Sequence, residues 1–119
     1  MPSSGLRLLR DYVERHNAGV RTGDFGPMLE YFADDAELVF EGAPIGPFRG
    51  REAIRAAYRD RPPDDTVEIL DAREDDRVVA AGYGWSREPG VRAGEIRLTL
   101  DDGRVAKLVV TFDAAGARR

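Results

Sequence analysis

The sequence predicts an α+β domain, with helices in the first half of the chain and a strongly bent antiparallel sheet in the second. Apolar residues recur at helical spacing in three segments before residue 62, and from residue 66 they alternate with polar residues in four segments. Asp102-Gly103, between the last two segments, is typical of a β-hairpin. At 119 residues we expect a single domain over residues 1–119, with its core at 6–112 and loose tails at 1–5 and 113–119.

Three helices are expected before the main sheet. The first begins near Leu6, where apolar residues start to recur every three to four positions, and it breaks at residues 22–24. The second follows Asp24 as its N-cap, carries Pro27 in its first turn and ends at residues 32–35. The third covers residues 51–61, because Pro62-Pro63 cannot continue a helix.

Five strands are expected, one of them short. Four cover residues 66–73, 77–87, 93–100 and 104–112, and the short one, residues 37–41, lies between the second and third helices. In this short strand Val39 and Glu41 share one face. Because an apolar loop follows, we expect the Glu41 carboxylate to lie near apolar walls, which would make it a useful base. A solvated strand end is the competing interpretation.

Composition narrows the class of function. The chain is 42% hydrophobic and 34% charged, which is typical of a soluble globular protein. A net charge of −4 with mixed signs argues against nucleic acid as a partner. Without cysteine and with one histidine, we expect no disulfide, thiolate or metal site. No apolar segment approaches a membrane span and no signal peptide is visible, so we expect no membrane contact and a cytoplasmic location.

Two segments carry a resemblance to a known family. Phe32-Ala33-Asp34-Asp35-Ala36 and Phe48-Arg49-Gly50-Arg51-Glu52-Ala53-Ile54 resemble the SnoaL-like polyketide cyclases and ketosteroid isomerases of the nuclear transport factor 2-like superfamily. The resemblance covers roughly residues 6–112. It implies a cone-shaped, cystatin-like fold in which the curved sheet and the helices enclose a pocket. It also implies a homodimer formed through the outer face of the sheet.

The function that this resemblance implies is acid–base catalysis without a cofactor. Such an enzyme would move a proton, in an isomerisation or a cyclisation, on a small, mainly apolar carbonyl or polyketide-like compound. The alternative is a non-catalytic module of the same fold that binds a small molecule or only dimerises.

The resemblance also points to individual catalytic residues. Tyr12 matches the first-helix tyrosine that stabilises the oxyanion in the isomerases, although a core tyrosine is an equal alternative. Glu41, counted back from Gly50, falls where those enzymes place their proton-shuttling aspartate. Their second oxyanion donor, an aspartate on a late strand, is missing, because the matching position falls near Ile96. This absence argues against steroid isomerisation itself and leaves general acid–base chemistry open.

Two further residues are candidates on their chemistry. His16 lies one helical turn after Tyr12, where a neutral imidazole would serve as an acid or a base, but a lone histidine more often only contacts water. Arg97 would bind a substrate oxygen if its strand face is concave, whereas burial of Ile96 and Leu98 favours the opposite face. Six apolar or aromatic residues are expected to form either a pocket wall or the core: Met28, Phe32, Phe48, Tyr58, Tyr83 and Trp85.

Overall fold

The computed structural model describes residues 4–42 and 44–113. Its elements in chain order are α1 (Ser4–Thr22), α2 (Gly26–Leu29), β1 (Phe32–Phe40), β2 (Phe48–Arg49), α3 (Arg51–Asp60), β3 (Val67–Asp75), β4 (Val78–Trp85), β5 (Gly94–Asp101) and β6 (Arg104–Val110). Helix α1 starts two residues earlier than predicted. The tails expected at residues 1–3 and 114–119 lie outside the described residues.

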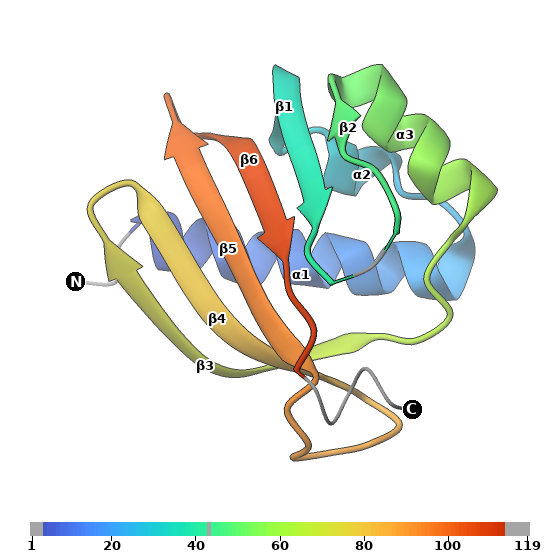
Figure 1. Cartoon of the computed structure of the whole chain (residues 1–119), viewed down its shortest axis with the longest axis vertical. Helices are drawn as coiled ribbons and strands as arrows, with labels where there is room; N and C mark the ends of the chain where they lie inside the picture. Colours follow the sequence, from blue (N-terminus) through green and yellow to red (C-terminus); the bar gives the residue numbers. More distant parts are fainter. Residues whose placement is uncertain (1–3, 43, 114–119) are drawn as a thin grey trace.

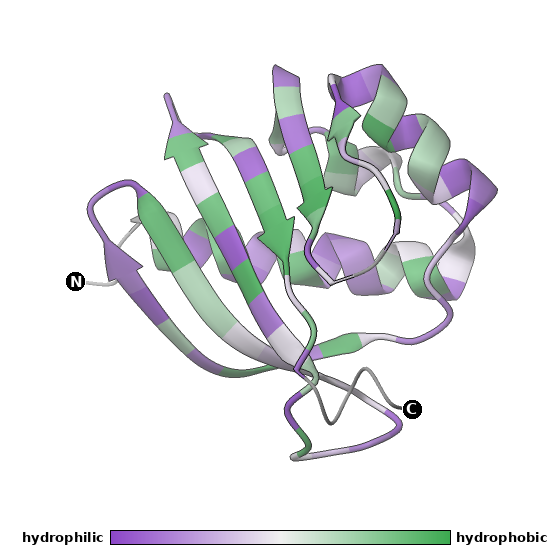
Figure 2. Cartoon of the chain, in the orientation of Figure 1, coloured by the Kyte–Doolittle hydropathy of each residue, from purple (hydrophilic) through white to green (hydrophobic). Residues whose placement is uncertain are grey.

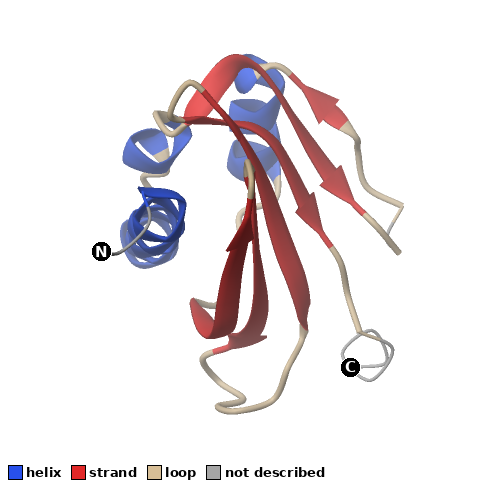
Figure 3. Ribbon diagram, turned by 90° about the vertical axis from the view of Figure 1, so that its left-hand side faces the viewer, coloured by secondary structure: helices blue, strands red, loops and turns tan. Residues whose placement is uncertain are grey.

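All six strands belong to one sheet of order β2-β1-β6-β5-β4-β3. Every neighbouring pair is antiparallel except β1 and β6, which run parallel. The helices lie on one side of this sheet, and the sheet curves around them (Figures 1 and 3). The predicted α+β architecture with a curved, mostly antiparallel sheet is therefore confirmed.

The two faces of the sheet differ in chemistry. Apolar and polar residues alternate along the strands (Figure 2), as expected when one face is buried and the other faces water. On β5, Ile96 and Leu98 are buried and Arg97 between them is exposed. The outer face carries ion pairs, among them Glu37 with Arg49 and Glu95 with Arg97.

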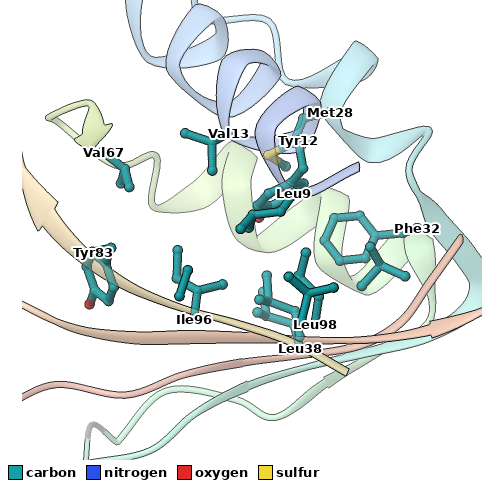
Figure 4. Packing of buried hydrophobic residues seen from close by; sticks show 14 of the residues in the cluster. Leu9, Tyr12, Val13, Met28, Phe32, Leu38, Val67, Tyr83, Ile96 and Leu98 are labelled. Carbon is teal, nitrogen blue, oxygen red and sulfur yellow. The ribbon is translucent and has the colours of Figure 1, made fainter. Parts of the chain in front are cut away.

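The core lies between α1 and the concave face of the sheet. Leu9, Tyr12 and Val13 on α1 point toward Ile96 and Leu98 on β5 (Figure 4). Full burial of one such side chain contributes roughly 1.5–3 kcal/mol to the free energy of unfolding, so this layer is the main source of stability.

The second helix is much shorter than predicted, because β1 already begins at Phe32. The backbone at this point finds its partners in distant elements. The Tyr31 carbonyl accepts a hydrogen bond from the Val105 N–H at 2.8 Å, and the Phe32 carbonyl accepts one from Arg51 Nη2 at 2.6 Å. Asp24 is not the N-cap residue, which is Phe25, but its carboxylate accepts the Gly26 N–H at 2.9 Å.

No helix in the described part of the chain is long and apolar enough to cross a membrane.

Candidate functional site

A cavity of about 220 Å³, here named the inner chamber, lies between α1 and the concave face of the sheet. Its walls are mainly apolar and come from α1, the sheet and the segments after α3 and β6: Val13, Val67, Trp85, Ile96, Leu108 and Phe112. Its polar groups are few. Among the described lining residues they are the hydroxyls of Tyr12, Tyr58 and Tyr83, the imidazole of His16, the indole of Trp85 and the guanidinium of Arg61.

A second cavity of about 480 Å³, the outer chamber, adjoins the first. It lies between α3 and the loop before β2, with Phe48 and Ala56 among its lining residues. Four residues line both chambers: Phe40, Ile45, Tyr58 and Arg61. These four therefore form the boundary between the two spaces.

Tyr12 and Tyr58 both line the inner chamber, and their hydroxyls lie close enough for each to shift the pKa of the other. Burial raises the pKa of Tyr12 well above its ordinary value, and the neighbouring Tyr58 raises it further. Burial also raises the pKa of Tyr58, and the hydrogen bond with Tyr12 partly offsets this. Both phenols are therefore protonated at neutral pH. A hydrogen bond between two hydroxyls uses the hydrogen of only one of them. The hydrogen of the other hydroxyl can therefore be donated to a ligand.

His16 is buried, with 8% of its surface exposed, and its position depends on Asn17. The Asn17 side chain bonds the edge of β3 twice: Nδ2 donates to the Val67 carbonyl at 2.9 Å, and Oδ1 accepts the Val67 N–H at 2.8 Å. These bonds fix the orientation of the amide, so the atom 3.0 Å from His16 Nδ1 is an acceptor. The hydrogen of the neutral ring therefore lies on Nδ1, and Nε2 carries the free lone pair.

Burial also keeps this ring neutral. Desolvation lowers the pKa of His16, and the hydrogen bond with Asn17 only partly offsets the effect. Nε2 has no hydrogen-bond partner within residues 4–42 and 44–113. It does not belong to the side-chain atoms of this region that lack a partner and are also closed off from solvent. Because His16 lines the inner chamber, its imidazole is a neutral base at this cavity.

Tyr83 and Trp85 form the wall of the chamber rather than its chemistry. The Tyr83 hydroxyl donates to the Thr111 carbonyl at 3.1 Å, and its ring meets Trp85 edge-on with centroids 5.7 Å apart. Burial raises the pKa of Tyr83 to about 12, with Asp113 adding to the shift and Arg92 opposing it. The hydroxyl is thus already bonded to the backbone.

The expected placement of Glu41 in the pocket is wrong. Glu41 lies in the turn after β1, is exposed and lines neither chamber. The alternation along the strand was predicted correctly, but Leu38 and Phe40 occupy the concave face, so Val39 and Glu41 face outward. The expected apolar loop lies on the other side of the strand, where Ile45 and Phe48 line the outer chamber.

Arg97 also lies outside the pocket. It is exposed on the outer face and its Nη2 lies 2.8 Å from Glu95 Oε1, as the burial of Ile96 and Leu98 requires.

Of the six expected wall residues, Met28 and Phe32 are fully buried in the core and line neither chamber. Phe32 packs instead against the edge of Tyr12, with ring centroids 5.9 Å apart. Phe48, Tyr58, Tyr83 and Trp85 do line a chamber.

Two residues of the site were not anticipated from the sequence. Arg61 follows Tyr58 by three positions at the end of α3, a spacing that places both on one helix face. Asn17 could not be identified as a site residue from the sequence, because its hydrogen-bond partner on β3 is fifty residues away along the chain. Residues 4–42 and 44–113 contain no group of three or more potential ligands arranged for a metal ion.

Comparison with known proteins defines the class to which this fold and pocket belong. Residues 13–111 match the model of the SnoaL-like domain, and the chain therefore belongs to the SnoaL-like family. No curated protein matches the sequence.

Solved structures agree on the fold, which is nuclear transport factor 2-like. A SnoaL-like protein of unknown function from Burkholderia thailandensis is 21% identical, with 96% of this chain and 98% of that chain covered and a TM-score of 0.75. An NTF2-like protein of unknown function from Burkholderia pseudomallei is 14% identical, with 98% of this chain and 95% of that chain covered and a TM-score of 0.74.

A third structure, from Kribbella flavida, carries the provisional name ketosteroid isomerase. It is 16% identical, with 92% of this chain and 78% of that chain covered and a TM-score of 0.74. At such identities the likeness of all three concerns the fold alone.

Proposed function

We propose that this protein binds a compact, mainly apolar compound in the inner chamber, through a carbonyl-type oxygen that accepts a hydrogen bond from the Tyr12–Tyr58 pair. The observation that supports this most is the combination of apolar walls with a pair of protonated phenols that has one hydrogen to spare. Small-molecule binding is also common among proteins of this fold. Pockets for drug-sized ligands usually exceed about 300 Å³, so the inner chamber suits a single-ring compound.

A fluorescence titration tests this proposal, because Trp85 is the only tryptophan of the chain and lines the inner chamber. Acetophenone is expected to change the Trp85 emission saturably. Ethylbenzene, which has a similar shape without the oxygen, should bind about fivefold more weakly, since a net hydrogen bond is worth about 1 kcal/mol. Equal affinities for acetophenone and ethylbenzene would show that the tyrosine pair does not bind the carbonyl oxygen. If neither compound changed the Trp85 emission saturably, the binding proposal would be refuted.

A second candidate function, proton transfer on the bound compound, is favoured by His16. Its Nε2 lone pair takes the place that the sequence suggested for Glu41. In this scheme Nε2 removes a proton from the carbon next to the carbonyl. The electrons of the broken C–H bond form the C=C bond of an enolate, whose oxygen accepts the hydrogen bond from the tyrosine pair. The protonated imidazole then returns the proton to the same or a neighbouring carbon.

Deuterium exchange into a bound ketone isolates this step from any later chemistry. Exchange at the methyl group of acetophenone in D₂O, followed by NMR, should be faster with the protein than without it. His16→Gln should lower the accelerated rate by about 10²- to 10⁴-fold while the Trp85 titration shows unchanged affinity. Exchange at the buffer rate with the wild-type protein would leave binding as the function.

The same proposal includes a homodimer through the outer face of the sheet. The outer face carries half-buried apolar residues, Val39 and Val109, beside the charged side chains of Glu95 and Arg97. This combination of apolar and charged groups supports the homodimer. Light scattering should then give twice the chain mass of 13.2 kDa, and a monomer at all concentrations would contradict it.

A further inference from the structure

We propose that the ligand carries a negatively charged group, a carboxylate, which Arg61 holds at the boundary between the two chambers. This inference rests on the proposed function, because it names the class of compound that the inner chamber takes. The apolar body would fill the inner chamber, and the carboxylate would lie where Tyr58 and Arg61 line both spaces.

Arg61 stands out by its charge environment. Within residues 4–42 and 44–113 its guanidinium has no hydrogen bond or ion pair, whereas its neighbours on α3, Arg55 and Arg59, each lie near a carboxylate. In the part of the chain that the structure describes, no aspartate or glutamate lines the inner chamber. Asp60 lines the outer one, and its Oδ1 lies 3.3 Å from Arg59. With His16 neutral, Arg61 is the one charged side chain among the described residues that line the inner chamber.

The position of Arg61 is fixed by the end of α3. Arg61 is the C-cap residue, and its backbone N–H donates to the Ala57 carbonyl at 2.9 Å. Pro62 and Pro63 follow, and Pro63 also lines the inner chamber. The backbone at this point is therefore stiff, and Arg61 is exposed while it lines both chambers. A guanidinium presents several N–H donors in a plane and matches the two oxygens of a carboxylate.

Matched ligands separate charge from shape. Isothermal titration calorimetry would compare 4-acetylbenzoate with 4-acetylbenzamide, which has nearly the same size but no charge. The carboxylate is expected to bind up to about tenfold more tightly, since the exposure of Arg61 to solvent reduces the strength of a charge-assisted hydrogen bond. The preference should shrink as salt is added, because exposed charges are screened.

Matched variants then assign the effect to Arg61. Arg61→Gln should abolish the preference for the carboxylate, and Arg61→Lys should keep part of it. Arg55→Gln removes the same charge from the same helix at a position that lines neither chamber, so it should bind both compounds as the wild type does. Equal binding of the two compounds, or equal effects of Arg61→Gln and Arg55→Gln, would overturn the inference.

The two proposals fail in different ways. If 4-acetylbenzoate binds through Arg61 but acetophenone does not bind, the neutral-carbonyl proposal falls and the carboxylate site stands. If acetophenone binds and 4-acetylbenzoate binds no more tightly than 4-acetylbenzamide, the carboxylate site falls and the neutral-carbonyl proposal stands. Binding of neither compound at millimolar concentration would overturn both.

Discussion

His16 titrates in a buried environment, and its effect on stability has a definite sign. Its pKa is lowered in the folded state, so the unfolded chain binds this proton more readily than the folded one. The contribution to the free energy of unfolding is therefore complete above the ordinary pKa of about 6.5 and is lost as the pH falls toward the lowered value. We expect urea denaturation to show lower stability at pH 5.5 than at pH 7.5.

His16→Gln provides the control, since it removes the titrating group and should flatten the pH dependence over this interval. The NMR signals of the imidazole give the pKa itself. A folded-state value above 6.5 would contradict the neutral base that the second candidate function requires.

The hydrogen bond between Tyr12 and Tyr58 is expected to contribute to stability as well as to binding. Tyr12→Phe removes it and should lower the free energy of unfolding by about 1 kcal/mol, because the Tyr58 hydroxyl faces a chamber that water can enter. Tyr31→Phe is the matched control. Tyr31 is half-buried and no described group bonds its hydroxyl, so we expect a change within about 0.5 kcal/mol. Equal effects of the two substitutions would contradict the pairing.

Single residues also show how far the sequence could predict the site. Tyr12 was identified through the resemblance to the isomerases, and His16 because it follows Tyr12 by one helical turn and therefore shares its helix face, which is a local rule. Glu41 was misplaced because alternation along a strand says which residues share a face but not which face is concave. That choice depends on the whole sheet, whose concave face carries Leu38, which is buried, and Phe40, which lines both chambers.

At the scale of elements, Asn17 ties α1 to β3, a strand at the edge of the sheet. Asn17→Ala removes both bonds to Val67 and the partner of His16 Nδ1, and should lower the free energy of unfolding by about 2 kcal/mol. Amide hydrogen exchange of β3 would check that the loss is local, with faster exchange at Val67. Glu14→Ala, an exposed substitution on the same helix, should leave both quantities unchanged.

The elements predicted least well are those held by distant partners. The helix expected over residues 24–35 is reduced to Gly26–Leu29, because the backbone of Tyr31 and Phe32 bonds to β6 and α3 instead. The parallel pairing of β1 with β6 joins residues about seventy positions apart, for which a single sequence gives no signal. In contrast, the hairpin at Asp102-Gly103 was predicted correctly, because its turn chemistry is local.

At the scale of the whole molecule, the fold class could be predicted because periodicity and turns agree along the chain. The two chambers could not, since pocket and core walls use the same residue types: Phe32 closes the core, whereas Phe40 and Phe48 line open space. The fold itself leaves the function undetermined. The proposed function therefore depends on whether the inner chamber accepts a ligand.

A cavity-filling pair of variants on β6 tests this most directly. Val110 lines the inner chamber, and Val109 next to it pairs with Arg97 on the outer face. In the Trp85 fluorescence titration with acetophenone, Val110→Phe should weaken binding at least about tenfold by occupying the chamber, and Val109→Phe should bind as the wild type does. Unchanged binding in Val110→Phe would show that the ligand lies elsewhere and would contradict the account.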